Sequence, residues 1–260
     1  MNILDKIIRD KRREVDLKKS ILPISQLETS VLFERQTISL ANALRNSHTG
    51  IIAEHKRRSP SKSTINQDTN VAQVAKGYEK AGVCGMSVLT DIKYFGGCLE
   101  DLLLARASVN MPLLRKEFII DEYQVVEAKA HGADVILLIA AVLTQNEIKL
   151  LSQLAKSLDL DVLLEVHNKE ELQKSIMPSL DMLGVNNRNL KTFKVSLETS
   201  KSLSRLIPND FVKVSESGIS SIEAIKDLKE FGYRGFLIGE NFMKTENPGK
   251  SATEFIQKLN

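Results

Sequence analysis

The chain alternates short apolar runs with longer segments that have the periodicity of helices. Eight apolar runs end near residues 54, 90, 116, 140, 165, 186, 216 and 239. Runs of this kind are typical of parallel strands that are buried on both faces. Successive run ends lie 21 to 36 residues apart, which leaves room for a helix and two short connections. The pattern therefore predicts eight strands joined by helical crossovers.

Segments with helical spacing of apolar positions fill the intervals between the runs. The expected helices are 71–81, 99–108, 121–131, 145–158, 169–176, 197–206, 220–231 and 250–259. Capping-box patterns mark two helix starts, with Thr144 before Glu147 and Ser220 before Glu223. The apolar runs and these segments together form eight alternating βα units.

Eight βα units in 260 residues fit a closed (β/α)8 TIM barrel, which typically has about 250 residues. An open doubly wound sheet is the alternative. It would more often carry a GxGxxG motif after its first strand, and the sequence has none. We therefore expect one α/β barrel domain over residues 1–260.

Residues 1–48 precede the first predicted strand and are expected to form an N-terminal helical extension packed on the barrel, with Ile3, Ile7 and Ile8 facing one way. The other interpretation is a basic arm for nucleic acid. Acidic residues interrupt its positive charge and aromatic residues are not interleaved, so we expect no nucleic-acid partner.

The composition is that of an ordinary globular protein, with 42% hydrophobic residues, 27% charged residues and a net charge of +3. No apolar run approaches the roughly 18 residues of a membrane span, and the N-terminus lacks a signal-peptide core. Cys84 and Cys98 do not have CxxC spacing, which argues against a disulfide framework or a zinc site. We expect a cytoplasmic protein with no membrane partner and no catalytic metal.

Polar side chains gather where the predicted strands end, which is where barrel enzymes place their catalytic groups. They are Glu54, Lys56, Lys116, Glu165, Asn186, Arg188, Glu216 and Ser217. Alternate residues of a strand share a face, so Glu54 and Lys56 should point the same way. Acids and lysines around one cavity can shift each other's pKa, as acid–base chemistry near neutral pH requires. The alternative is a set of salt bridges that closes the top of the barrel.

Two glycine-containing loops predict phosphate recognition. The segments SESGI (215–219) and LIGEN (237–241) follow the seventh and eighth predicted strands, where many barrels bind phosphate through loop amides. Gly218 and Gly239 would let the backbone approach an anion closely. Ser59 is available after the first strand, so we expect a phosphorylated substrate.

Eight motifs in order carry a resemblance to a known family. They are IIAEHKRRSPS (51–61), VLTDIKYFGG (88–97), PLLRKEFIID (112–121), GADVILLIA (132–140), LLEVHNKEE (163–171), LGVNNRNLKTF (183–193), VSESGI (214–219) and FLIGENFM (236–243). The chain resembles the indole-3-glycerol phosphate synthase family of tryptophan biosynthesis from about residue 50 to its C-terminus. The resemblance also implies a barrel with N-terminal helices.

The family's reaction converts 1-(2-carboxyphenylamino)-1-deoxyribulose 5-phosphate to indole-3-glycerol phosphate by ring closure with loss of carbon dioxide and water, without a cofactor. The resemblance implies that Lys116 is the general acid at the ribulose carbonyl and that Glu165 takes part in the proton transfers of dehydration. It implies that Lys56 contacts the substrate carboxylate and that Glu54 is its partner acid.

The resemblance also implies roles for the other candidates. Asn186 and Glu216 match further active-site residues, and Arg188 matches a carboxylate contact. The phosphate-loop positions are Ser59, Ser217, Gly218, Gly239 and Glu240. An apolar wall for the anthranilate ring could come from Phe95, Phe118, Leu137 and Leu190, each of which could equally be part of the core.

Three positions depart from the usual family pattern, namely His55, Ser63 and Glu117, which stands where aspartate is more common; none removes a functional side chain. Three other functions remain as alternatives. The first is an isomerase such as phosphoribosylanthranilate isomerase, which normally pairs a cysteine with an aspartate. The others are a flavin- or phosphate-binding barrel without this activity and a degenerate barrel that serves as an interaction module. We expect a monomer whose partner is a small phosphorylated anthranilate-derived substrate. Association with another enzyme of the pathway remains open.

Overall fold

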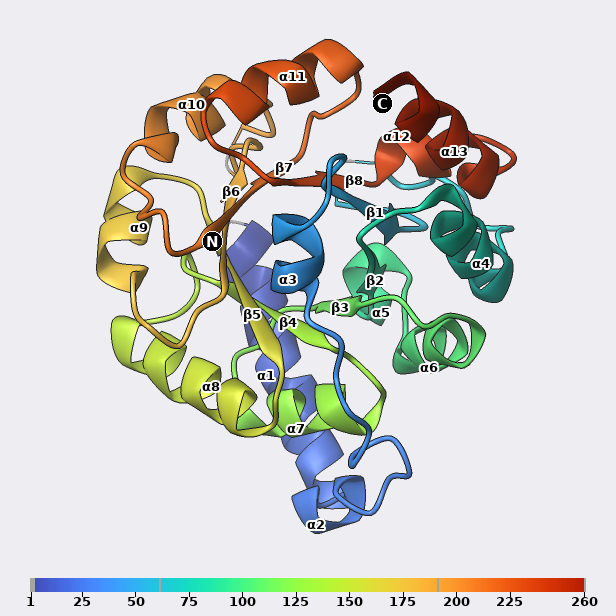
Figure 1. Cartoon of the computed structure of the whole chain (residues 1–260). Helices are drawn as coiled ribbons and strands as arrows, with labels where there is room; N and C mark the ends of the chain where they lie inside the picture. The colour runs from blue at the N-terminus through green and yellow to red at the C-terminus, as the bar shows by residue number, and fades with distance from the viewer. Residues whose placement is uncertain (1–2, 61, 191, 260) are drawn as a thin grey trace.

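The computed structural model describes residues 3–60, 62–190 and 192–259. Eight parallel strands, each hydrogen-bonded to its neighbour in chain order, close into a barrel (Figure 1). The strands are β1 (Ile51–His55), β2 (Gly85–Leu89), β3 (Leu113–Lys116), β4 (Val135–Ile139), β5 (Asp161–Val166), β6 (Met182–Asn186), β7 (Val212–Glu216) and β8 (Gly235–Ile238). The predicted (β/α)8 barrel is confirmed.

Helices follow the strands and form the outer ring. They are α4 (Val71–Ala81), α5 (Ile92–Phe95), α6 (Leu99–Ser108), α7 (Glu122–Ala130), α8 (Gln145–Ser157), α9 (Lys169–Ser175), α10 (Glu198–Ser204), α11 (Ile222–Glu230), α12 (Glu240–Met243) and α13 (Pro248–Leu259). Every predicted helix is present, with ends that shift by at most two residues. The four-residue helices α5 and α12 were not predicted, because a single turn is too short to show an apolar period.

The two predicted capping boxes have different outcomes. As expected, the Thr144 side chain caps α8 by accepting from the backbone N of Glu147, and the Glu147 side chain accepts from the backbone N of Thr144. The expectation for Ser220 is wrong, because the neighbouring Ser221 caps α11 by accepting a hydrogen bond from the backbone N of Ala224 at 3.2 Å. Two consecutive serines leave the start of the helix ambiguous by one residue, and local sequence does not decide between them.

Side chains alternate between the inside and the outside of the barrel. Leu114, Leu163 and Val214 belong to the interior core. Each stands two residues before a charged residue at the end of the same strand. Since alternate residues share a face, the parity carries those charged side chains inward at the carboxyl ends of the strands. The polar strand ends therefore converge at one mouth of the barrel.

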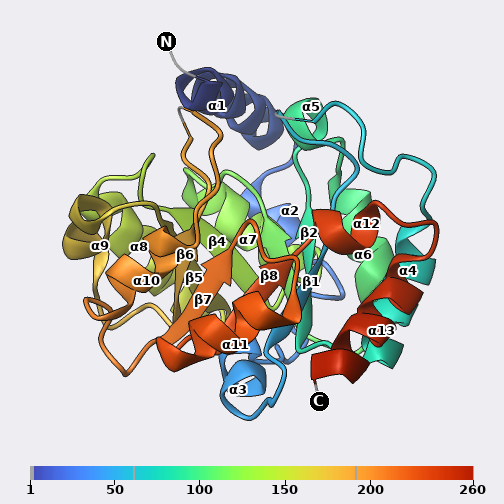
Figure 2. The same ribbon diagram turned by 90° about the horizontal axis from the view of Figure 1, so that it is seen from above.

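The N-terminal segment is helical in part. It contains α1 (Ile3–Ile21), α2 (Ile24–Leu27) and α3 (Leu40–Arg45), with turns and irregular chain over 28–39. Figure 2 shows α1 across one end of the barrel and α3 at the opposite end. Buried Leu40 and Leu44 of α3 join the interior core and cover the amino-terminal end. The two ends of the barrel are thus covered by different parts of the same segment.

A buried lysine ties α1 to the barrel mouth. Lys11 is 2% exposed, and its Nζ lies 3.0 Å from Asp91 Oδ2, 3.1 Å from Glu117 Oε1 and 2.8 Å from Glu14 Oε2. Burial by itself would lower the pKa of Lys11, but the surrounding carboxylates outweigh it and raise that pKa above its ordinary value. Because Glu117 directly follows Lys116, this cluster connects α1 to the strand end that carries a candidate catalytic residue.

Candidate active site

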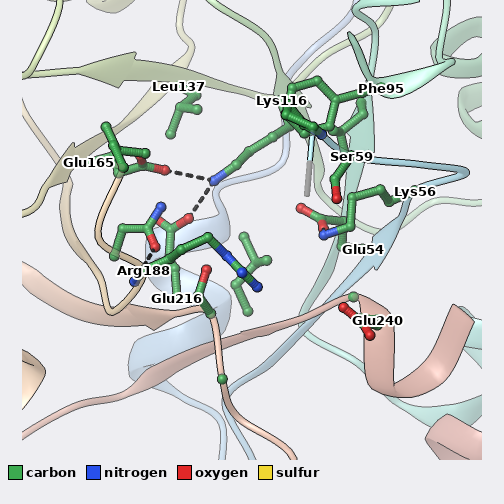
Figure 3. Close-up of a pocket in the computed structure, with 18 of the residues that line it drawn as sticks. Glu54, Lys56, Ser59, Phe95, Lys116, Leu137, Glu165, Arg188, Glu216 and Glu240 are labelled. Atoms are coloured by element: carbon green, nitrogen blue, oxygen red, sulfur yellow. Dashed lines mark hydrogen bonds and ion pairs between the residues drawn. The ribbon is translucent and has the colours of Figure 1, made fainter. Parts of the chain in front are cut away.

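A cavity of about 350 Å³ opens at the carboxyl ends of the strands (Figure 3). Every candidate site residue named from the sequence lines it. These are Glu54, Lys56, Ser59, Phe95, Lys116, Phe118, Leu137, Glu165, Asn186, Arg188, Leu190, Glu216, Ser217, Gly218, Gly239 and Glu240. Positions separated by up to 186 residues in the sequence are therefore brought to one cavity.

Lys116, at the end of β3, occupies the centre of the cavity's charged side. Its Nζ lies 3.1 Å from Glu165 Oε2 and also contacts Glu216 Oε2, as the dashed lines of Figure 3 show. Burial alone would lower the pKa of Lys116, but the carboxylates of Glu216, Glu165 and Glu54 outweigh this effect and raise it. The side chain is therefore an ammonium ion that points into the cavity.

The two acids beside Lys116 have opposite protonation behaviour. Burial, the largest influence on both, favours their neutral forms. For Glu165, the charges of Lys116 and His167 and a hydrogen bond with Asn186 outweigh burial and lower its pKa to about 2. For Glu216, burial and the neighbouring Glu165 dominate and raise its pKa to about 7. Two acids held apart in this way can serve different steps of one reaction.

Glu216 also has an unused acceptor. Its Oε1 is buried and has no hydrogen-bond partner within the described part of the chain. A buried acceptor without a partner is costly, and a catalytic role is one of the explanations for such an atom. The charged centre thus combines an ammonium donor on Lys116 with an unsatisfied buried acceptor on Glu216.

Glu54 and Lys56 form an ion pair at the end of β1, with Lys56 Nζ 2.7 Å from Glu54 Oε1. Glu54 is 4% exposed at its side chain and Lys56 is 20% exposed, so the lysine is the member that reaches solvent in the cavity. After β6, the backbone N of Arg188 donates to Asn186 Oδ1 at 3.0 Å. Two cationic side chains, Lys56 after β1 and Arg188 after β6, therefore line the cavity.

Consecutive residues after β7 have left-handed backbone, Ser217 at φ 67° and Gly218 at φ 78°. This conformation suits glycine and is unusual for serine. Gly239 precedes α12, whose first residue is Glu240. The Glu240 carboxylate turns to Lys62, 2.8 Å away, which lowers its pKa. Ser217, Gly218, Gly239 and Glu240 all line the cavity.

The cavity has an apolar side as well. The rings of Phe95 and Phe118 lie with centroids 6.0 Å apart and planes at 40°. Leu137, which is 1% exposed, belongs to the barrel core and also lines the cavity. Leu190, from the loop after β6, completes the predicted set.

Sequence reasoning missed several lining residues. Ile3, Leu4 and Ile7 come from α1, and Phe193 comes from the loop after β6. The amphipathic pattern of 1–21 predicted a packed helix, but it does not show on which part of the barrel that helix rests. Lys244, just after α12, also lines the cavity and would have been found by reading one turn beyond the last strand.

Over 3–60, 62–190 and 192–259, no group of three or more His, Cys, Asp or Glu side chains is placed to hold a metal ion. Within the same residues, no helix has the length and apolar character to cross a membrane.

The fold and the cavity define an enzyme built on a (β/α)8 barrel with a lysine–carboxylate centre. The family model for indole-3-glycerol phosphate synthase matches residues 4–255. Indole-3-glycerol phosphate synthase of Bacteroides thetaiotaomicron is 48% identical over 258 residues, covering 99% of both chains. That of Dechloromonas aromatica is 43% identical and covers 95% of this chain and 96% of its own. The chain belongs to the indole-3-glycerol phosphate synthase family.

Solved structures show the same fold at low sequence identity. 3-Hexulose-6-phosphate synthase from Salmonella typhimurium has a TM-score of 0.63 at 12% identity, covering 81% of this chain and 98% of its own. The tryptophan synthase alpha subunit from Legionella pneumophila has a TM-score of 0.61 at 13% identity, covering 85% and 96%. Family membership makes this protein a carboxy-lyase of tryptophan biosynthesis, in place of the isomerase and the non-catalytic alternatives.

Proposed function

We propose that this cavity converts 1-(2-carboxyphenylamino)-1-deoxyribulose 5-phosphate to indole-3-glycerol phosphate, with Lys116 as the general acid of ring closure. The observation that carries the proposal is the Lys116 ammonium held between Glu165 and Glu216 inside the cavity. The family match supports the reaction, and the geometry supports the roles of individual residues.

Ring closure places negative charge on the ribulose carbonyl oxygen when an aromatic carbon attacks the carbonyl carbon. An ammonium already positioned in a water-poor site stabilises that charge and can deliver its proton. Lys116 keeps its proton at rest because its pKa is raised by the adjacent acids. An alkoxide is a stronger base than an amine, so proton transfer from Lys116 to the new alkoxide is favourable.

Proton delivery by Lys116 changes the carboxylate beside it. The charge of Lys116 is the largest of the influences that lower the pKa of Glu165. Once that charge is gone, Glu165 becomes a stronger base. After carbon dioxide has been lost, Glu165 can accept the ring proton, and the hydroxyl group leaves as water with a proton that Lys116 relays from Glu216. We propose Glu165 as this base and Glu216, with its free acceptor oxygen and a pKa of about 7, as the group that exchanges protons with Lys116.

Lys56 and Arg188 are the proposed contacts of the substrate carboxylate. Both are cationic and both line the cavity, Lys56 after β1 and Arg188 after β6. The ion pair with Glu54 holds Lys56 in place. Asn186 holds the Arg188 backbone and hydrogen-bonds Glu165, so it positions both groups. The substrate carboxylate leaves as neutral carbon dioxide, so the product no longer carries the negative charge that these cations bind. Loss of this interaction favours departure of the product.

The substrate phosphate is proposed to bind at the loops after β7 and β8, through the amides of Ser217, Gly218, Gly239 and Glu240, with Ser59 opposite. The positive φ angles at 217 and 218 mark a tight turn after β7, and backbone N–H groups in turns can form concave sites for anions. The anthranilate ring would lie against Phe95, Phe118, Leu137 and Leu190, with Ile3, Leu4 and Ile7 of α1 covering it.

Other features of the protein are also proposals. We infer a cytoplasmic monomer that works without a cofactor, organised as one barrel domain over 1–260 with residues 1–48 as its extension. The burial of α3 in the barrel interior supports a single unit, because the extension shares the barrel's core.

An assay tests the proposed function directly. Purified protein is incubated with the carboxyphenylamino-deoxyribulose phosphate, and indole fluorescence is followed with time. Growth of the indole signal that depends on enzyme concentration is expected. A protein that binds the substrate without forming indole would refute the proposal.

A further inference from the structure

A histidine outside the cavity's lining contacts the proposed base from behind. His167 follows β5 directly and has the same parity as Glu165, so its side chain turns toward the barrel mouth. Its Nε2 lies 3.3 Å from Glu165 Oε1, while Lys116 contacts the other oxygen, Oε2. Each oxygen of the Glu165 carboxylate therefore has its own nitrogen neighbour.

The other ring nitrogen of His167 faces a second carboxylate. Nδ1 lies 3.1 Å from Glu171 Oε2, and the backbone N of His167 donates to the same oxygen at 2.8 Å. Glu171 is itself fixed, because its Oε1 accepts a hydrogen bond from Asn168 Nδ2 at 2.8 Å. The His167 side chain is 9% exposed, so it bridges two carboxylates in a largely buried place.

This arrangement favours the charged form of the ring. A neutral imidazole carries one donor and one lone pair, so one nitrogen would direct a lone pair at a carboxylate. An imidazolium has donors on both nitrogens and suits both neighbours. The charged groups around the ring are Glu165 from β5, Glu171 from α9 and Glu216 from β7, with Lys116 of β3 beyond Glu165. Burial lowers the pKa of His167, and the three acids outweigh it and raise that pKa above 6.5.

We propose that His167 is a positioning residue for the reaction, an imidazolium that is anchored by Glu171 and holds the Glu165 carboxylate in its productive orientation. The inference rests on the role proposed for Glu165. The charge of His167 can nevertheless be tested independently of that role, because it can be measured without turnover. The 3.3 Å contact between His167 Nε2 and Glu165 Oε1 is an electrostatic one, because Nε2 has no hydrogen-bond partner among the described residues.

Positioning by His167 gives Glu165 an asymmetric environment. When Lys116 loses its proton, the imidazolium still holds Oε1 and leaves Oε2 to act as the base. Without the ring charge, Oε1 would lose its cationic neighbour and the carboxylate would keep only the hydrogen bond with Asn186 and its contact with Lys116. A displacement of about 1 Å in a catalytic group can reduce the rate by ~10²-fold, so the loss should appear in kcat.

The charge is tested by NMR titration of the imidazole signals of the intact protein. The chain has four histidines, and the His167 signal is identified by its loss in His167→Gln. We expect a titration midpoint above 6.5 for His167, and a lower midpoint in Glu171→Gln, which keeps an acceptor oxygen but removes the charge. Burial lowers the pKa of His55 to about 4 and also lowers that of His131, so these two serve as internal controls. A midpoint at or below 6.5, or one that Glu171→Gln does not move, would overturn the proposal.

Kinetics test the positioning role. His167→Leu should lower kcat by ~10-fold or more with KM little changed, and His167→Gln, which keeps an N–H donor, should recover part of the loss. The alkaline fall of kcat that coincides with the NMR midpoint should be absent from His167→Gln. Parent-like kcat in a folded His167→Leu protein would refute the role. Absence of turnover in the parent protein would count against the proposed function, and the NMR titration would still decide the charge.

Discussion

Gly184 leaves the space that the Glu216 side chain occupies. A Cβ atom at position 184 would overlap Glu216 Oε1 and lie 3.1 Å from Leu163 Cδ1. Gly184 is in β6, one strand away from Glu216, and its missing side chain lets the carboxylate reach across toward Lys116. The glycine therefore serves the active site through space, although it carries no chemistry of its own.

Gly184→Ala should displace the Glu216 carboxylate and lower kcat by ~10-fold or more, because a catalytic group shifted by about 1 Å is no longer aligned. Steady-state kinetics and thermal unfolding would be measured together. The matched control is Gly82→Ala, at a left-handed position with φ 79° where an added Cβ meets no atom within 4 Å. The control should lose stability and keep its kcat. Equal kcat in the two variants would show that Glu216 tolerates the shift.

Much of the fold and the site could be predicted from the sequence. Strand ends such as Lys116, Asn186 and Glu216 followed from apolar runs that stop at a polar residue, and barrel closure then placed them together. The position of α1 could not be predicted, since an amphipathic helix shows which face is buried and not what it is buried against. The roles of Gly184 and Lys11 depend on contacts between elements far apart in sequence, and no local pattern reports those contacts.

The second prediction concerns the proposed phosphate loops after β7 and β8. An added side chain at Gly218, where φ is 78° and Val195 is close, should distort the loop after β7. One lost charge-assisted hydrogen bond of about 1.5–3 kcal/mol corresponds to ~10- to 100-fold weaker substrate binding in Gly218→Val. Inorganic phosphate should raise the melting temperature of the parent protein and should do so less in the variant.

Gly239→Val should have a second effect, because its Cβ would lie 2.5 Å from Glu54 Oε1 and disturb the pair with Lys56. The control for both variants is Gly232→Val, which has φ 82° and whose nearest neighbour, Lys213 Nζ, lies 3.5 Å away and outside the cavity. If substrate affinity in the Gly218 and Gly239 variants matched that of the control, the phosphate site would lie elsewhere.

The Lys11 cluster makes a prediction for stability. Lys11→Met removes the cation beside the buried Asp91 carboxylate and leaves Glu117 with the more distant Arg115, 3.9 Å away, which should cost about 3–5 kcal/mol of unfolding free energy. Lys19→Met, on the same helix, breaks a pair with Asp121 that is 42% and 31% exposed, and should cost at most about 1 kcal/mol.

Denaturant titration of the two α1 variants would measure the difference. The pKa of Lys11 is raised above its ordinary value of 10.5 in the folded protein. The ion pairs of Lys11 therefore contribute fully to stability below pH 10.5, and this contribution is lost only as the pH rises further. The gap between parent and Lys11→Met should therefore be constant from about pH 6 to about pH 9. Similar losses for both lysine variants would contradict the anchoring role of Lys11.

Glu216 makes a prediction for pH dependence. Burial and the neighbouring Glu165 raise the pKa of Glu216, and Lys116 lowers it; the result is a pKa of about 7. The kcat/KM profile should contain an ionisation near pH 7 that Glu216→Gln lacks, while ionisation of the substrate phosphate persists in both. The folded state favours the protonated acid, so stability falls as pH rises from 4.5 to 7, and Glu216→Gln should gain stability relative to the parent over that interval. Identical profiles would place the ionisation on another group.

The central claim is that the Lys116 ammonium protonates the substrate carbonyl, and single-turnover measurement of indole formation in Lys116→Met tests it most directly. Methionine keeps the length and packing of the side chain but removes the proton, so turnover should fall by at least ~10²-fold while substrate remains bound. Lys93→Met, which changes a lysine that is 62% exposed on α5, should retain parental turnover. Near-parental indole formation by a folded Lys116→Met protein would contradict the assignment.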